Sequence, residues 1–129
     1  NFRWQISTNG STKVSCDSLN GSLPGLNQWI HLVGTWDATN MKIYINGTLN
    51  KTISSGVASG TFSNTNNILI GARETTGGYF PGKIDEVAVF DYTLDSDQVQ
   101  EIYDATSTGV TADLDTLSTP PVAWYRMGD

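Results

Sequence analysis

Apolar and polar residues alternate at the start of the chain. Within the segment 2–6 the even positions are apolar and the odd positions are polar, which is the pattern of a half-buried β-strand. Asn9-Gly10 follows, a dipeptide that favours a tight turn, and the segment 13–16 predicts the returning strand. The first sixteen residues therefore predict a β-hairpin, and residues 17–27 predict a polar loop.

The most apolar segment, 29–37, is rich in β-branched and aromatic residues and is followed by the polar stretch 37–40. It predicts a central strand. The next strand, 41–45, places Met41, Ile43 and Ile45 on one face, with Lys42 and Tyr44 on the other. Asn-Gly at 46–47 predicts a type I′ turn that joins this strand to residues beginning at position 48.

The middle of the chain predicts a long polar connection and two further strands. Residues 54–67 are rich in Ser, Gly and Asn, with Val57 and Phe62 expected to point inward. The apolar run 67–72 predicts a buried strand, and 82–90 predicts another. In the second of these Asp85 shares the parity of Val87 and Val89, so either a bulge shifts the register or a carboxylate points toward the core.

The remaining third predicts one short helix, a linker and a strand. Asp95 and Gln98 have the spacing of a capping box, and apolar residues recur at the helical spacing at 99, 102 and 103. Residues 106–121 are polar and end in Pro-Pro, which is typical of an extended linker. Residues 122–129 resume the pattern of a strand.

Four of these segments follow one another in the order of a known family. They are the run 29–37, Lys42 to Gly47, the run 82–90, and Leu94 with the helix 98–103. Together they resemble the laminin-G-like and concanavalin A-like lectin domains. The resemblance implies an all-β fold, an antiparallel two-sheet jelly-roll sandwich with one short C-terminal helix.

The order of the motifs bears on the domain organisation. Domains of this family begin with a strand resembling Ala-Trp-Tyr-Arg-Met-Gly-Asp, and here that sequence occupies 123–129. We expect a domain over 1–105 that lacks its first strands, a linker over 106–121, and over 122–129 the first strand of a following domain. The alternative is a circular permutant, in which 122–129 is the closing strand of the same domain.

Composition narrows the classes of partner. The 129 residues include 7 Lys and Arg against 13 Asp and Glu, a formal charge of -6, which disfavours binding to nucleic acid. No run approaches the ~20 apolar residues that span a bilayer, so membrane insertion is not expected. Cys16 is the only cysteine, which excludes an internal disulfide and a Cys-based zinc site.

A sugar-binding site requires an exposed aromatic ring for the apolar face of the pyranose, together with polar groups for its hydroxyls. Tyr79, beside Phe80 in a Gly-rich loop, and Tyr44 are the candidate rings. The candidate polar groups are those of Arg73, Glu74 and Asn66. The alternative is that Phe80 fills the core and Tyr79 merely covers it.

Asp85 is the candidate metal ligand, since Ca²⁺ takes carboxylate and carbonyl oxygens. The alternative is a carboxylate that accepts hydrogen bonds from backbone amides at a bulge. Glu86 is adjacent, so the two side chains should point to opposite faces and not flank one glycosidic bond. His31, the only histidine, lies among apolar residues and is expected in the core rather than in catalysis.

The resemblance implies a non-catalytic, lectin-like binding or structural module of a larger extracellular, cell-surface or virion protein, in a tandem array. Its partners would be a glycan or protein surface and a neighbouring domain of the same family, and oligomers are allowed. Two alternatives stay open at this point. One is a carbohydrate-binding appendage of a secreted glycoside hydrolase, and the other is a purely structural or oligomerisation domain.

Overall fold

The computed structural model describes residues 1–7, 9–57, 59–60, 65, 67–74, 77–107 and 113–127, without the side chains of 73, 74, 106 and 107. The chain divides into two compact units. Unit 1 comprises Asn1–Phe62 and Tyr92–Asp113, and unit 2 comprises Ser63–Asp91 and Leu114–Asp129. Within the described residues no helix is long and apolar enough to cross a membrane.

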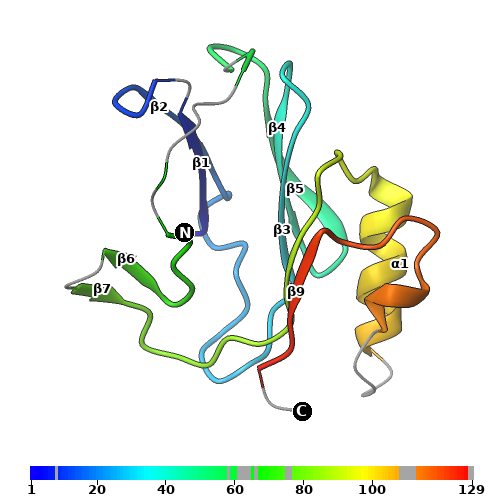
Figure 1. Cartoon of the computed structure of the whole chain (residues 1–129). Coiled ribbons are helices and arrows are strands. Elements are labelled where there is room, and N and C mark those ends of the chain that lie inside the picture. The colour runs from blue at the N-terminus through cyan, green and yellow to red at the C-terminus, as the bar shows by residue number, and fades with distance from the viewer. Residues whose placement is uncertain are drawn as a thin grey trace. The chain divides into compact units, whose positions relative to one another are not determined.

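Unit 1 begins with the predicted hairpin (Figure 1). Strands β1 (Arg3–Ser7) and β2 (Lys13–Asp17) pair antiparallel, with Trp4 opposite Cys16. The Asn9 side chain stabilises the turn, since its Oδ1 accepts hydrogen bonds from the amides of Ser11 and Thr12 at 2.9 and 2.6 Å. The alternating pattern therefore predicted this hairpin correctly, because both its register and its turn are specified locally.

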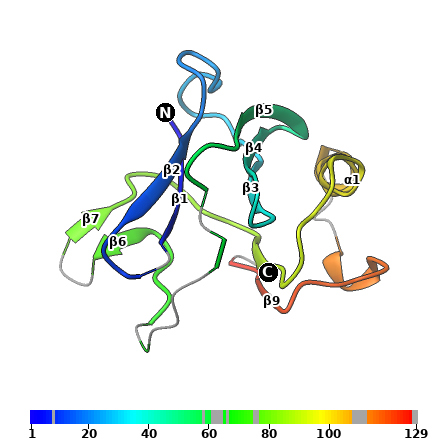
Figure 2. The same ribbon diagram turned by 90° about the horizontal axis from the view of Figure 1, so that it is seen from above.

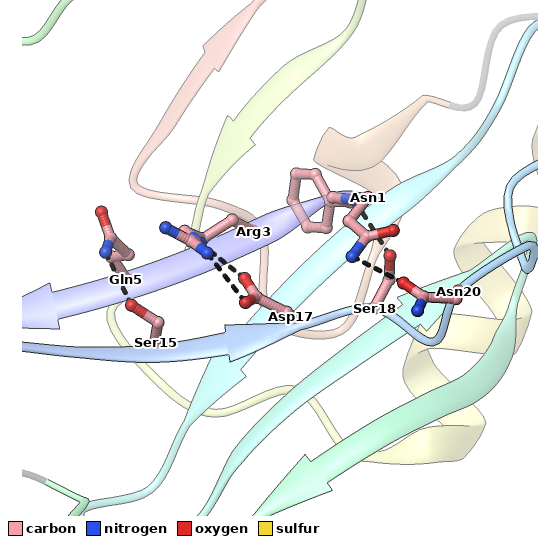
Figure 3. A network of polar contacts seen from close by, with 8 residues as sticks. Asn1, Arg3, Gln5, Ser15, Asp17, Ser18 and Asn20 are labelled. Carbon is pink, nitrogen blue, oxygen red and sulfur yellow. Dashed lines mark hydrogen bonds and ion pairs between the residues drawn. The ribbon is translucent and has the colours of Figure 1, made fainter.

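The outer face of this hairpin carries a ladder of polar side-chain pairs (Figure 3). Arg3 donates from Nε and Nη2 to the two carboxylate oxygens of Asp17, at 2.6 and 2.9 Å. The hydrogen bond from Arg3 lowers the pKa of Asp17. Gln5 donates to Ser15 Oγ at 2.6 Å in the next pair of the same face. On the face opposite the core, polar side chains of β1 therefore form hydrogen bonds with polar side chains of β2.

A three-stranded antiparallel sheet forms the second layer of unit 1. It comprises β3 (Leu32–Trp36), β4 (Met41–Ile45) and β5 (Thr48–Ile53) in that order. Asp37 closes the turn after β3, where its Oδ1 accepts from the amides of Thr39 and Asn40. Asn46 and Gly47 have φ of 50° and 78°, as the predicted type I′ turn requires.

The core of unit 1 lies between the hairpin and this sheet. Cys16 on β2 and Met41, Ile43 and Ile45 on β4 form its buried cluster, against which partly buried side chains including Trp4 and Val57 pack. The Trp4 ring lies directly against Gly34 of β3, where an added Cβ would be 2.8 Å from Trp4 Cδ2. The inward parity predicted for β4 is confirmed, as is the inward position of Val57, while Phe62 lies outside the described residues.

The helix α1 (Ser96–Ser107) forms a third layer on the other side of the sheet (Figure 2). Its predicted capping box is present: Gln98 N donates to Asp95 Oδ1 at 2.8 Å, and Asp95 N donates to Gln98 Oε1 at 3.0 Å. Val99 and Ile102 are buried, with exposed fractions of 0% and 7%. The helix docks on the β4–β5 turn, where Gly47 adjoins Gln100 and Tyr103.

Unit 2 contains two short antiparallel ribbons. Strands β6 (Ala72–Glu74) and β7 (Gly77–Tyr79) form one, and β8 (Val87–Val89) and β9 (Ala123–Tyr125) form the other. A 3₁₀ helix, η1 (Leu114–Thr116), precedes β9, with Leu114 buried. Beyond α1, which ends at Ser107, residues 108–112 of the predicted linker lie outside the described part of the chain.

The predicted buried strand over 67–72 is wrong. Strand structure begins only at Ala72, and Ile68, Leu69 and Ile70 have exposed fractions of 72%, 41% and 36%. The apolar run predicted burial from hydrophobicity alone. Burial itself depends on which side chains from distant parts of a chain lie against the segment.

Candidate functional site

Tyr79 is the most exposed of the candidate ligand-binding rings. It ends β7, opposite Ala72 of β6, and has an exposed fraction of 70%. Phe80 follows with an exposed fraction of 58%, and its amide donates to Gly71 O at 2.8 Å. The Phe80 ring lies over Gly82, where an added Cβ would be 2.7 Å from Phe80 Cε1. Phe80 therefore does not fill the core, and the β6–β7 ribbon presents two exposed aromatic rings.

Of the polar residues predicted to bind sugar hydroxyls beside Tyr79, the structure describes the backbone of two. Arg73 and Glu74 lie on β6, paired with the strand that carries Tyr79, while their side chains lie outside the description. Asn66 lies outside the described residues altogether. Three of the five predicted ligand-binding residues thus share one ribbon, and their role in binding stays a prediction.

Tyr44 lies in unit 1 and not on the surface. Its exposed fraction is 2%, and burial raises the pKa of its hydroxyl, as does the charge of Asp95 at the start of α1. The expectation that the outward parity of β4 faces solvent is incorrect, because α1 covers that side of the sheet (Figure 2). The buried ring is not accessible for stacking on a sugar in this structure.

Asp85 and Glu86 precede β8 at an irregular point of the backbone. Glu86 has φ of 53°, in the left-handed region that non-glycine residues rarely adopt. Asp85 is exposed, and its Oδ1 accepts from Glu86 N at 3.0 Å and from Met127 N at 3.2 Å. The parity conflict is thus resolved by a local backbone distortion, and the carboxylate does not point toward the core.

Glu86 joins β8 to β9 through a cluster that the sequence did not reveal. Trp124 Nε1 donates to Glu86 Oε2 at 2.6 Å, and Arg126 Nε lies 3.9 Å from Glu86 Oε1. The Arg126 guanidinium carbon is 4.9 Å from the centre of the Trp124 ring, a cation–π distance. The spacing of Trp124 and Arg126 could have indicated this cluster, because residues two apart in an extended segment lie on the same face.

The other titratable candidates occupy structural positions. Burial lowers the pKa of His31, whose ring stacks on Tyr103 of α1 with 5.8 Å between ring centroids. Cys16 is fully buried, and burial raises the pKa of its thiol. Among the described residues no three His, Cys, Asp or Glu side chains gather as a metal site. Asp85 therefore remains the single predicted metal ligand, and its Oδ1 already accepts hydrogen bonds from two backbone amides.

Comparisons with known proteins add to this description. The chain is 31% identical over 101 residues to adhesion G-protein coupled receptor D1 of Bos taurus. That match covers 78% of this chain and 10% of the receptor, so the chain corresponds to about a tenth of it. A solved S-layer domain-containing protein from Clostridium thermocellum is 17% identical, with a TM-score of 0.47, over 71% of this chain and 45% of that one.

A family model matches most of the chain. Residues 1–100 match the model described as the concanavalin A-like lectin/glucanases superfamily. The match agrees with antiparallel strands and, in the described part of the chain, one α-helix, and it confirms the jelly-roll class expected from the motifs. The chain belongs to the concanavalin A-like lectin/glucanases superfamily.

Proposed function

We propose that this chain belongs to a non-catalytic binding module of a larger extracellular protein, with a glycan or protein surface as its ligand. Membership of a superfamily that includes lectins and similarity to an adhesion receptor support a binding function. A cell-surface or virion protein with such modules in tandem would be a suitable setting. The single observation that carries the proposal is the exposed ring of Tyr79.

Tyr79 suits recognition of a sugar better than the other tyrosine candidate. Its ring is 70% exposed at the end of a strand, so a pyranose can stack on it without displacing a core residue. The ribbon's paired backbone holds Tyr79 in position. A rigid aromatic ring costs little conformational entropy when it binds, which favours its use in recognition.

Replacing Tyr79 with alanine should weaken glycan binding by about tenfold, which corresponds to ~1.4 kcal/mol. The intact protein would be screened on a glycan array, and the affinity for the best glycan measured by calorimetry. Trp29→Ala is the matched control, because Trp29 is also an exposed aromatic residue, at 67%, but belongs to unit 1. We expect the control to retain the affinity of the unsubstituted protein.

Other outcomes would assign a different function. Loss of binding in Trp29→Ala but not in Tyr79→Ala would exclude the β6–β7 ribbon as the site. An intact protein that binds no glycan would favour a protein ligand or a structural role. A glycan-binding protein with a catalytic domain in the neighbouring sequence would be the appendage of a secreted hydrolase instead.

Calcium binding at Asp85 is a separate proposal, supported by the exposed carboxylate. A bound ion stabilises the folded state by about 2.7 kcal/mol when its concentration is a hundred times the dissociation constant. If Asp85 binds Ca²⁺, millimolar CaCl₂ will raise the melting temperature relative to EDTA, and Asp85→Asn will abolish that rise. Equal melting temperatures in CaCl₂ and EDTA would remove Asp85 as a ligand.

A further inference from the structure

Strand β9 contacts a short segment of unit 2, residues 85–89, through both backbone and side-chain interactions. Its backbone pairs with β8 in the register Val87 to Tyr125, Ala88 to Trp124 and Val89 to Ala123. Val122 N extends the pairing by donating to Val89 O at 2.8 Å. Among the described residues, the hydrogen bonds of this ribbon join the segment 85–89 to the segment 122–127.

Side chains make this recognition specific. Trp124 of β9 and Arg126, just after it, both contact Glu86: Trp124 by a 2.6 Å hydrogen bond and Arg126 at an ion-pair distance of 3.9 Å. Asp85 then accepts from Met127 N at 3.2 Å, which sets the end of the segment. An extended segment without Trp and Arg at this spacing would lose the contacts with Glu86.

The segment that carries β9 is separated along the chain from the rest of unit 2 by a part of unit 1. Chain order passes from unit 2 at Asp91 through unit 1 and returns to unit 2 at Leu114. The exposed fractions of Val122, Tyr125 and Met127 are 60%, 43% and 41%, and Ala123 and Trp124 are partly buried, so the segment is only partly covered. A two-stranded ribbon that is only partly buried can open at a lower free energy than the whole unit.

We propose that the β8 edge accepts the segment 122–127 of a second copy of this chain, which gives a strand-exchanged dimer. The backbone pairing and the contacts of Glu86 with Trp124 and Arg126 would be the same in both arrangements. Exchange of an identical element between two copies is a low-cost route to a dimer, because it creates the same contacts that it breaks. The partner is specified by the Trp-x-Arg segment, and each copy both donates and accepts one strand.

The test uses two full-length variants, each with one new cysteine. Val89 lies opposite Ala123 across the ribbon, so a mixture of Val89→Cys and Ala123→Cys chains can form that disulfide only between two copies. Cys16 is fully buried and is retained. We expect a disulfide-linked dimer on denaturing gels, in an amount that rises with protein concentration, and a matching dimer in light scattering of the unsubstituted chain.

The double variant Val89→Cys/Ala123→Cys in a single chain is the control for geometry. Disulfide formation within that chain, without any linked dimer in the mixture, would overturn the proposal. A chain that stays monomeric in light scattering at all concentrations would overturn it regardless of cross-linking.

Trp124→Phe provides a kinetic test, because it keeps the ring and removes the N–H that donates to Glu86. Because this charge-assisted hydrogen bond is then absent, we expect cross-linking about tenfold faster, which corresponds to ~1.4 kcal/mol, while the final dimer fraction stays the same. Trp29→Phe, whose ring is exposed in unit 1, should leave the rate unchanged. A Trp124→Phe rate equal to that of the unsubstituted chain would contradict the proposed opening of this ribbon.

Discussion

Gly34→Ala is expected to lower the free energy of unfolding of unit 1 by about 1–3 kcal/mol, the usual cost of overpacking a core. An alanine Cβ at this position would lie 2.8 Å from Cδ2 and 2.9 Å from Cγ of Trp4. Those atoms belong to a rigid ring and not to the end of a flexible chain. Relief therefore requires β1 to move away from β3 or the Trp4 ring to rotate out of the core.

Urea denaturation followed by tryptophan fluorescence measures this effect. Gly25→Ala is the matched control, because an added Cβ at Gly25 meets nothing within 4 Å, and its change in stability should stay within about 0.5 kcal/mol. Equal stabilities of the two variants would show that Trp4 does not pack on Gly34. Trp4→Leu combined with Gly34→Ala should cost less than the sum of the two single changes, since the overlap is then absent.

Gly47→Ala should be at least as damaging, for two separable reasons. Gly47 has φ of 78°, and an alanine held in the left-handed region costs roughly 1–2 kcal/mol. Its Cβ would also lie 2.7 Å from Gln100 Oε1 and 2.9 Å from Tyr103 Cδ1, where α1 docks on the turn. We expect a lower free energy of unfolding and faster amide exchange throughout α1.

Gly21→Ala separates the two causes, because Gly21 has φ of 72° and an added Cβ there meets nothing within 4 Å. The control should show only the backbone cost, with amide exchange of α1 unchanged. Gln100→Ala should relieve part of the overlap at Gly47 and leave the contact with Tyr103. If Gly47→Ala and Gly21→Ala lose the same stability, α1 does not pack on the β4–β5 turn as the structure shows.

The elements that the sequence predicted correctly are those with local causes. The Asn-Gly turn at 46–47 needs only its own dihedral angles, and the capping box of α1 needs only Asp95 and Gln98, three residues apart. The inward face of β4 followed from the two-residue period of a strand. No partner from elsewhere in the chain had to be known for these features.

The candidate site was only partly predictable, because the exposure of its residues depends on contacts with distant parts of the chain. The exposure of Tyr79 was anticipated, whereas Tyr44 is buried because a helix some fifty residues later in the chain covers the second face of β4. Composition and parity identify a ring that can stack on a sugar. Whether that ring is accessible depends on side chains that are distant in sequence.

By itself, the sequence determined the superfamily, the strand-forming segments of unit 1, the turns and the single α-helix of the described residues, since each depends on residues close together or on motifs in order. Tertiary structure alone decided that Ile68 to Ile70 are exposed, that Glu86 adopts a positive φ, and that β9 pairs with β8. The Glu86 and Trp124 side chains are 38 residues apart and meet only after two ribbon strands have paired. A pattern read along the chain carries no information on which distant segment supplies the partner, because that choice rests on the free energy of the whole packed unit.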